Sequence, residues 1–359
     1  MKFKINKLKL KTLYIFFLIV ALNNFFFSTG KTDIKAFDIE NIELSQPFEI
    51  DFNKNEIINK GFRLAFSKLI SLIASSKDRE TIKNTKLNKI KGMIESFTIK
   101  EEKFIDQIYY VNLGVTFNKK KVFSYLENNN IFPTIPKKKN FLFLPIIIDE
   151  SKKNLLLFSD NIIFEKWNEN LNSYDLIDYV LPSEDLEDIN LLRQNYEFIE
   201  NYDFKDITKK YSLENSIIAL IFKNSNEIKV LSKISIKENI KLKNQSFINI
   251  DLENKDHIKN LINQLKTLYE DHWKISNQIN TSIKFPIKIV LKSKNEMKIS
   301  KFERILDEMD LIYDFFIYKY EKNKIFYKII FNGTPNIFLK NMKEEDYTFD
   351  TQNKIWVLK

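Results

Sequence analysis

The sequence has 359 residues, of which 44% are hydrophobic and 29% are charged, and its formal net charge is +9. These proportions exclude an intrinsically disordered chain, and the length predicts two or three domains, of which we expect three. The sequence contains no cysteine, which excludes disulfides, thiol nucleophiles and thiolate zinc sites.

The first 30 residues have the layout of an export signal. Lysines at positions 2, 4, 7, 9 and 11 precede the apolar run Leu13–Leu22. This run is shorter than the roughly 20 apolar residues that a membrane-spanning helix needs. We therefore expect residues 1–30 to be a signal peptide, cut after Gly30, and the protein to be periplasmic. The alternative is an uncleaved segment that tethers the protein to the inner membrane.

The positive charge of the chain does not indicate nucleic-acid binding. The lysines of the leader supply much of the net charge, because no acidic residue lies among them. Arginine makes bidentate hydrogen bonds to phosphate and guanine, and it occurs only at Arg63, Arg79, Arg193 and Arg304. We expect no nucleic-acid partner, and contact with a membrane only through the leader if it stays attached.

Residues 31–135 predict an α+β domain that opens with a strand and a long helix. Residues 37–50 read as extended, and Asn53 with Glu56 forms a capping pattern for the helix that follows. Apolar residues at three-and-four spacing then predict one buried helix face, formed by Ile58, Phe62, Ala65, Phe66, Leu69, Ile70 and Ile73. The same spacing from Leu87 to Phe97 predicts a second helix.

The clearest strand of this domain is Tyr109–Phe117, where apolar and polar residues alternate. Asn118 can cap a short helix directly after it. The proline- and lysine-rich stretch Pro133–Lys139 then marks a domain boundary.

Residues 136–278 predict a middle α/β domain with a mixed sheet. Phe141–Ile148 is apolar on both faces, as expected for a strand that is covered on two sides. The remaining predicted elements are helices near 162–171, 186–198 and 204–211, and a hairpin over 215–236 that turns near Asn224–Asn226. A long helix from Asn254 to Ile275 closes the domain, with one apolar line along Ile258, Leu261, Leu265, Leu268 and His272.

Residues 279–359 have the element order βαββαβ, which matches the ferredoxin-like arrangement. The predicted elements are a strand at 284–292, a helix around 301–309, strands near 312–320 and 325–331, a helix ending at Met342 and a last strand at 354–358. Many unrelated proteins use this arrangement, so it indicates no function.

The glycines exclude the common phosphate-binding loops. Gly30, Gly61, Gly92, Gly114 and Gly333 are too far apart for either GxGxxG or GxxxxGK, and the G-x-S-x-G nucleophile elbow is also missing. We therefore expect no nucleotide or other cofactor, and no catalytic residue stands out.

The acidic stretch Leu181–Leu192 is the one candidate metal or catalytic site. Glu184, Asp185 and Asp188 supply the carboxylates that Mg²⁺ or Ca²⁺ prefers, and Asp188 would share a helix face with either of the others. Helix physics offers a second explanation, with Ser183 as the N-cap and the acids opposite the positive end of the helix dipole. The sequence favours this structural interpretation.

His257 and His272 are the histidines of the chain, and they lie too far apart for an H-x-x-x-H metal pair. Helical periodicity places His272 on the apolar line of the long helix, beside Trp273. We expect a packed histidine there, in preference to a ligand or a general base.

Three stretches together resemble the exported bacterial family called domain of unknown function 2066. They are "RLAF" at 63–66, "YVNLGVTF" at 110–117 and "LPSEDLED" at 181–188, and the similarity extends over most of residues 37–235. The chain departs from the family's pattern at Pro136-Lys137 and Phe143. The resemblance implies an exported protein of similar architecture and supplies no catalytic residue.

We therefore expect a non-catalytic periplasmic protein that binds a protein partner in the assembly or maintenance of the cell envelope. The alternative hypothesis is a metal-dependent enzyme that uses Glu184, Asp185 and Asp188.

Overall fold

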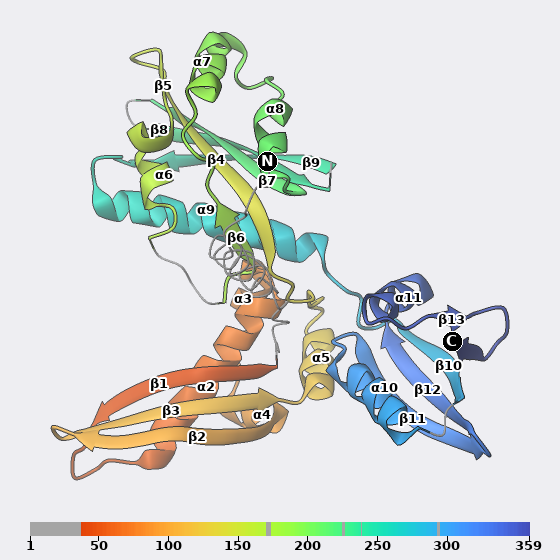
Figure 1. The fold of residues 1–359 in the computed structure, drawn as a ribbon. Helices are drawn as coiled ribbons and strands as arrows, with labels where there is room; N and C mark the ends of the chain where they lie inside the picture. Colours follow the sequence, from red (N-terminus) through yellow and green to blue (C-terminus); the bar gives the residue numbers. More distant parts are fainter. Residues whose placement is uncertain (1–36, 170–173, 225–226, 238, 293–294) are drawn as a thin grey trace, which may run out of the picture. The chain divides into compact units, whose positions relative to one another are not determined.

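Three sheets are formed by successive stretches of the chain (Figure 1). The computed structural model describes residues 37–169, 174–224, 227–237, 239–292 and 295–359, so the predicted signal peptide lies outside the described residues. These described residues belong to one compact unit. The predicted multi-domain class that combines α+β and α/β units is confirmed, and the boundaries at 135 and 278 remain predictions.

The first sheet is antiparallel, and its strand order is β1-β3-β2. β1 (Asp38–Pro47) and β3 (Ile108–Phe117) confirm two predicted strands. β2 (Ile94–Ile105) is joined to β3 by Asp106 and Gln107, whose φ angles of 50° and 58° suit a two-residue type I′ turn. The predicted alternation of β3 holds, because Tyr109, Val111, Leu113, Val115 and Phe117 are all buried.

Helix α2 (Lys54–Ile73) packs on one face of this sheet (Figure 1). Its N-cap is Asn53, as predicted, and the Asn53 side chain accepts a hydrogen bond from the Asn55 N–H. Gly61 allows a close approach to the sheet, since a Cβ there would lie 2.5 Å from Leu113 Cδ1 and 3.0 Å from Leu44 Cδ1. A larger residue would require the Leu113 and Leu44 side chains to move.

The predicted helix over Leu87–Phe97 is wrong at its C-terminal end. α4 covers Leu87–Met93, and the chain from Ile94 onward is strand β2. The cause is tertiary, because β2 takes its hydrogen bonds from β3, and helical spacing cannot reveal such a partner. Two other short helices flank this region, α3 (Ser76–Ile82) and α5 (Lys119–Asn128), and α5 is capped by Asn118 as predicted.

The middle sheet is mixed, as predicted, with strand order β5-β4-β7-β8-β9 and with β6 also paired to β4. Its strands are β4 (Lys139–Asp149), β5 (Asn154–Leu156), β6 (Ile177–Val180), β7 (Asn215–Lys223), β8 (Glu227–Ile236) and β9 (Asn239–Ile248). β4 runs parallel to β6 and β7, and it is buried along Phe141–Asp149. The predicted hairpin is β7 with β8, and residues 225–226 of its turn lie outside the described residues.

The short helices of the middle region are α6 (Ile162–Lys166), α7 (Leu186–Gln194) and α8 (Lys205–Thr208). Single 3₁₀ turns follow α7 and α8, at Tyr196–Phe198 and Lys209–Tyr211, where the sequence predicted continuous helices. The predicted end of the first helix, Leu171, lies outside the described residues.

The long helix α9 (Lys255–Ser276) begins after its N-cap Asn254, as predicted. The predicted apolar line is wrong in its second half, because Leu268 and His272 are only half-buried. The buried face instead continues through Tyr269 and Trp273, which lie one position later. The face also contains Lys266, Glu270 and Lys274, three charged residues that an apolar pattern passes over.

The C-terminal sheet has strand order β11-β12-β10-β14-β13. Its elements are β10 (Lys284–Lys292), α10 (Glu296–Glu308), β11 (Ile312–Glu321), β12 (Lys324–Asn332), α11 (Pro335–Glu344), β13 (Phe349–Asp350) and β14 (Trp356–Leu358). The order βαββα and a final strand are confirmed, but β13 is an additional strand. β13 and β14 form an antiparallel pair, and the last strand, β14, runs parallel to β10. In the predicted βαββαβ arrangement the strand after the second helix is the last one, and it would run antiparallel to β10.

The two predicted boundary segments lie against each other. Thr134 and Gln278 form an antiparallel bridge, and the Ile279 N–H donates to the Pro133 carbonyl oxygen at 2.9 Å. The Trp273 Nε1–H also donates to the Lys137 carbonyl oxygen, at 3.1 Å. Within the described ranges, no helix is long and apolar enough to cross a membrane.

Candidate functional site

Three charged side chains on the buried face of α9 form the centre of the candidate site. Lys266, Glu270 and Lys274 follow one another at four-residue spacing, so they lie on one side of the helix. Their exposed fractions are 8%, 6% and 4%. Charged residues are almost never buried this deeply unless other groups compensate their charge, so each requires a partner.

The Glu270 carboxylate is held by the start of β6. Its Oε1 accepts hydrogen bonds from the N–H groups of Leu176 and Ile177, at 2.9 and 2.8 Å. Its Oε2 accepts no hydrogen bond from any described residue, and the Lys274 ammonium lies 3.7 Å from it. Burial raises the pKa of the Glu270 carboxyl, although Lys274 and the two backbone N–H groups act in the opposite direction.

Lys274 connects α9 to the end of α2. Its Nζ donates to the Ser71 carbonyl oxygen at 2.6 Å. Burial lowers the pKa of this lysine, and the neighbouring Glu270 carboxylate opposes that change. The carbonyl at the C-terminal end of α2 is a suitable acceptor, because the last carbonyls of a helix have no partner within the helix.

Lys266 lies over an aromatic cluster. Its Nζ is 5.6 Å from the centre of the Trp167 ring and 5.9 Å from that of Tyr179, distances that fit cation–π contacts. The Trp167 ring stacks on Phe143 with a centroid separation of 3.8 Å. Burial lowers the pKa of Lys266 and raises that of Tyr179.

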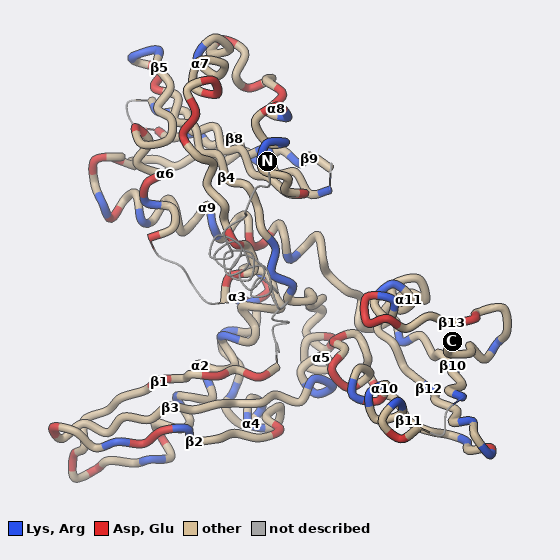
Figure 2. The backbone as a smooth tube through the Cα atoms, viewed as in Figure 1, with Lys and Arg blue, Asp and Glu red and all other residues tan. Residues whose placement is uncertain are grey.

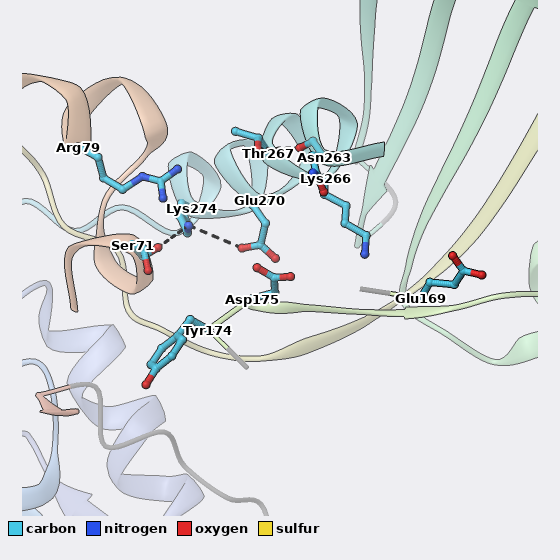
Figure 3. A pocket seen from close by; sticks show the side chains of 10 residues that line it. All are labelled: Ser71, Arg79, Glu169, Tyr174, Asp175, Asn263, Lys266, Thr267, Glu270 and Lys274. Atoms are coloured by element: carbon cyan, nitrogen blue, oxygen red, sulfur yellow. Dashed lines mark hydrogen bonds and ion pairs between the residues drawn. The ribbon is translucent and has the colours of Figure 1, made fainter. Parts of the chain in front are cut away.

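These groups line a pocket of about 440 Å³ (Figure 3). Its lining consists of Ser71, Arg79, Glu169, Tyr174, Asp175, Asn263, Lys266, Thr267, Glu270 and Lys274. Figure 3 shows the Asp175 and Glu270 carboxylates pointing toward each other, and the charge of Asp175 contributes to the raised pKa of Glu270. The three basic and three acidic side chains of the lining balance in formal charge.

The predicted acidic site lies elsewhere, at the start of α7. Asp185 is the N-cap, and its Oδ1 accepts from the Glu187 N–H at 2.9 Å. The prediction that Ser183 caps this helix is wrong, because the helix starts at Leu186 and its N-cap is Asp185. The Ser183 backbone N–H instead donates to the Tyr211 hydroxyl oxygen, 2.9 Å away.

A lysine lies between two of the three predicted carboxylates. Lys210 Nζ is 2.9 Å from Asp185 Oδ2 and 2.8 Å from Asp188 Oδ1. Lys210 and the Glu187 backbone N–H lower the pKa of Asp185, and the two carboxylates raise the pKa of Lys210. Glu184 is engaged separately, by the Ser159 hydroxyl at 2.9 Å. The structure therefore brings Asp185 and Asp188 together around an ammonium group.

No group of three or more acidic, histidine or cysteine side chains suited to a metal ion occurs within the described part of the chain. His257 is half-buried at the start of α9, where its Nδ1 accepts from the Asp251 N–H at 3.2 Å. His272 is half-buried, and burial lowers its pKa, with Lys243 and Lys241 acting in the same direction.

The apolar pattern of the sequence does not predict the buried charged residues on α9. The available signal was the run of Lys266, Glu270 and Lys274 at four-residue spacing with alternating sign. Such a run usually marks a solvent-exposed helix face. Its burial depends on backbone groups of Ser71 and Leu176, which are remote in the sequence.

No protein-family model matches this chain. A search of curated proteins likewise finds no match in sequence.

Proposed function

We propose that this chain is an exported, non-catalytic protein that binds another polypeptide in the bacterial cell envelope. The basic and apolar leader supports export, and the resemblance to an exported family supports the compartment. The observation that carries the binding role is the exposed edge strand β2. The proposed partner is a polypeptide that adds an extended segment to this strand.

β2 offers a long edge for strand addition. It extends over Ile94–Ile105, all of its residues except Ile94 are exposed, and within the described part of the chain it pairs with β3 alone. An edge strand of this length presents a row of backbone donors and acceptors to another chain.

The face of β2 beside α2 is apolar. Phe97, Ile99 and Phe104 lie opposite Val115, Leu113 and Tyr109 of β3, so they share the face that α2 covers on the other strands. Yet these three side chains keep 45%, 38% and 59% of their surface exposed. A partner that extends the sheet at β2 would bury this apolar surface as well as pair the backbone.

The charges on β2 do not block this approach. Lys100 is paired with Glu40 on β1, Glu102 with Lys54, and Lys103 with Glu101. Figure 2 shows lysines and acidic residues interspersed along this strand and across the other described segments. The mixture of both signs supports a polypeptide partner over nucleic acid, which favours a face of one positive sign.

The metal-enzyme alternative receives no support from the site it would use. Lys210 places a positive charge between Asp185 and Asp188, where a cation would have to bind. We therefore propose a binding function and no metal-dependent catalysis.

Photo-crosslinking from β2 tests the binding role. A benzophenone side chain is placed at Thr98 in the full-length chain in cells, and the matched control places it at Leu242 on β9, the exposed edge of the middle sheet. We expect one discrete crosslinked polypeptide from Thr98 and none from Leu242. The substitution Ile99→Asp should abolish this product, whereas Ile240→Asp on β9 should leave it unchanged. Equal crosslinking from both strands would contradict the proposal.

Cell fractionation with N-terminal sequencing tests export separately. We expect the mature chain in the periplasmic fraction, beginning after Gly30. An intact Met1 on a chain in the inner-membrane fraction would support the tethered form. An intact Met1 on a soluble cytosolic chain would rule out export.

A further inference from the structure

We propose that the pocket beside α9 binds a small zwitterion of the amino-acid type, with its ammonium group at Glu270 Oε2 and its carboxylate at the Lys266 ammonium. This inference goes beyond the proposed function, since it concerns a different surface from β2. It rests on one deeply buried acceptor, on the charge balance of the lining and on the spacing of the two side chains.

Glu270 Oε2 is an acceptor held in place without a hydrogen-bond donor. The Glu270 side chain keeps 8% of its surface exposed, and Oε1 is fixed by two backbone N–H groups, so the carboxylate cannot turn away easily. No described residue donates a hydrogen bond to Oε2, because Lys274 Nζ, at 3.7 Å, is too distant for one. A buried carboxylate oxygen in this position gains strongly from a charged donor such as an ammonium group.

The lining favours a ligand that carries both charges. Arg79, Lys266 and Lys274 balance Glu169, Asp175 and Glu270 in formal charge. A simple cation or anion would therefore leave an unbalanced charge beside the buried Lys266, Glu270 and Lys274, which is costly. A zwitterion forms an ion pair at each end and adds no net charge.

The spacing of Glu270 and Lys266 suits the two ends of an α-amino acid. Residues four apart on a helix have Cβ atoms about 5–6 Å from each other, so their charged groups can reach neighbouring atoms of one small ligand. The exposed Asn263 and Thr267 lie on the same helix and line the open side of the pocket. A volume of about 440 Å³ admits an amino acid or a dipeptide.

Isothermal titration calorimetry of the full-length chain tests this inference, with L-alanine and L-alanyl-L-alanine as the probes. We expect saturable binding of at least one of them. Ethylamine lacks the carboxylate and propionate lacks the ammonium group, so each should bind at least about tenfold more weakly. Ethylamine that binds as tightly as the zwitterions would overturn the proposal in favour of a cation site.

Variants then locate the binding. Glu270→Gln keeps the shape of the side chain and Lys266→Met keeps its length, and each should weaken binding by about tenfold to a hundredfold. Lys259→Met, on the exposed face of the same helix, is the control and should bind normally. Circular dichroism shows whether each variant folds. If Glu270→Gln does not fold, the binding measured for Lys266→Met tests the proposal. The absence of saturable binding at millimolar ligand, or normal binding by a folded Lys266→Met, overturns the proposal.

Discussion

Asp271 on α9 accepts two hydrogen bonds from Ser76, the first residue of α3. The Ser76 backbone N–H lies 2.7 Å from Asp271 Oδ1, and the Ser76 hydroxyl donates to Oδ2. A carboxylate at the N-terminus of a helix satisfies a free N–H group and also interacts favourably with the helix dipole. This contact joins the helix of the middle region to the chain that follows α2.

Removing this carboxylate should weaken the folded state. We expect Asp271→Ala to lower the free energy of unfolding by about 1–3 kcal/mol, because the Ser76 N–H and hydroxyl lose a charged acceptor. Chemical denaturation measures the change. Glu80→Gln is the control, since it breaks only an exposed ion pair with Lys83 on α3 and should cost less than about 0.5 kcal/mol. If both variants lower the free energy of unfolding equally, the Asp271 contact stabilises the fold no more than an exposed ion pair does.

Breaking the buried ion pair should cost more. Lys274→Met leaves the Glu270 carboxylate without its nearest positive charge, and such a loss typically costs about 3–5 kcal/mol. The double variant Lys274→Met/Glu270→Gln removes both charges, so it should recover part of that loss. A double variant no more stable than Lys274→Met would show that the charge of Glu270 is not the source of the effect.

The Lys274→Met defect should also depend on pH. Burial already raises the pKa of Glu270, and without Lys274 it should rise further. A carboxyl with a raised pKa in the folded state binds its proton more tightly there, so stability falls as the pH rises from the unfolded value to the folded one. Unfolding measured at a series of pH values should therefore show a growing deficit toward neutral pH, which is absent in the double variant.

The Tyr109 phenol should ionise at a higher pH than an ordinary tyrosine. Burial and the nearby Glu102 carboxylate raise the pKa of its phenol to about 12 from an ordinary value of 10.0. The folded state holds this proton more tightly, so its contribution to stability is complete below pH 10 and is lost as the pH rises to about 12. Tyrosinate absorbance of the folded protein should show a step near pH 12 whose amplitude falls by one tyrosine in Tyr109→Phe. The step should remain in Tyr110→Phe, which removes the neighbouring exposed ring.

Substitutions of Asp185, at the start of α7, distinguish helix capping from metal binding. Asparagine caps helices as well as aspartate does, so Asp185→Asn should leave the melting temperature close to that of the wild type, apart from the lost Lys210 pair. Asp185→Ala should lower it by a few degrees. Calorimetry with Mg²⁺, Ca²⁺ and Mn²⁺ should show no binding that these changes remove. Saturable cation binding that is lost in both Asp185→Asn and Asp188→Asn would restore the metal-enzyme hypothesis.

Much of the fold could be predicted where the signal is local. Asn53 and Asn254 mark the starts of α2 and α9, and the alternation of Tyr109–Phe117 identifies β3, because capping and periodicity depend only on neighbouring residues. The local pattern instead predicts helix up to Phe97, where the chain forms β2, because the hydrogen bonds of β2 come from a strand that follows it in the chain.

The candidate pocket could not be predicted from the same signals. Lys266, Glu270 and Lys274 are charged, so an apolar pattern assigns them to the solvent side of α9. Their burial is made possible by the aromatic rings of Trp167 and Tyr179, the backbone of β6 and the Ser71 carbonyl. These partners come from three separate stretches of sequence, and only the tertiary fold brings them to one helix face.

The bridge between Thr134 and Gln278 places the two ends of the segment 135–277 next to each other. The intervening residues, 135–277, therefore have the connectivity of a guest inserted into a host. We expect that this insert can be removed and the host ends rejoined by a short turn, or that it can be inserted into another protein through the same pair of adjacent ends. The hydrogen bond from the Ile279 N–H to the Pro133 carbonyl oxygen then marks the junction between this insert and its host.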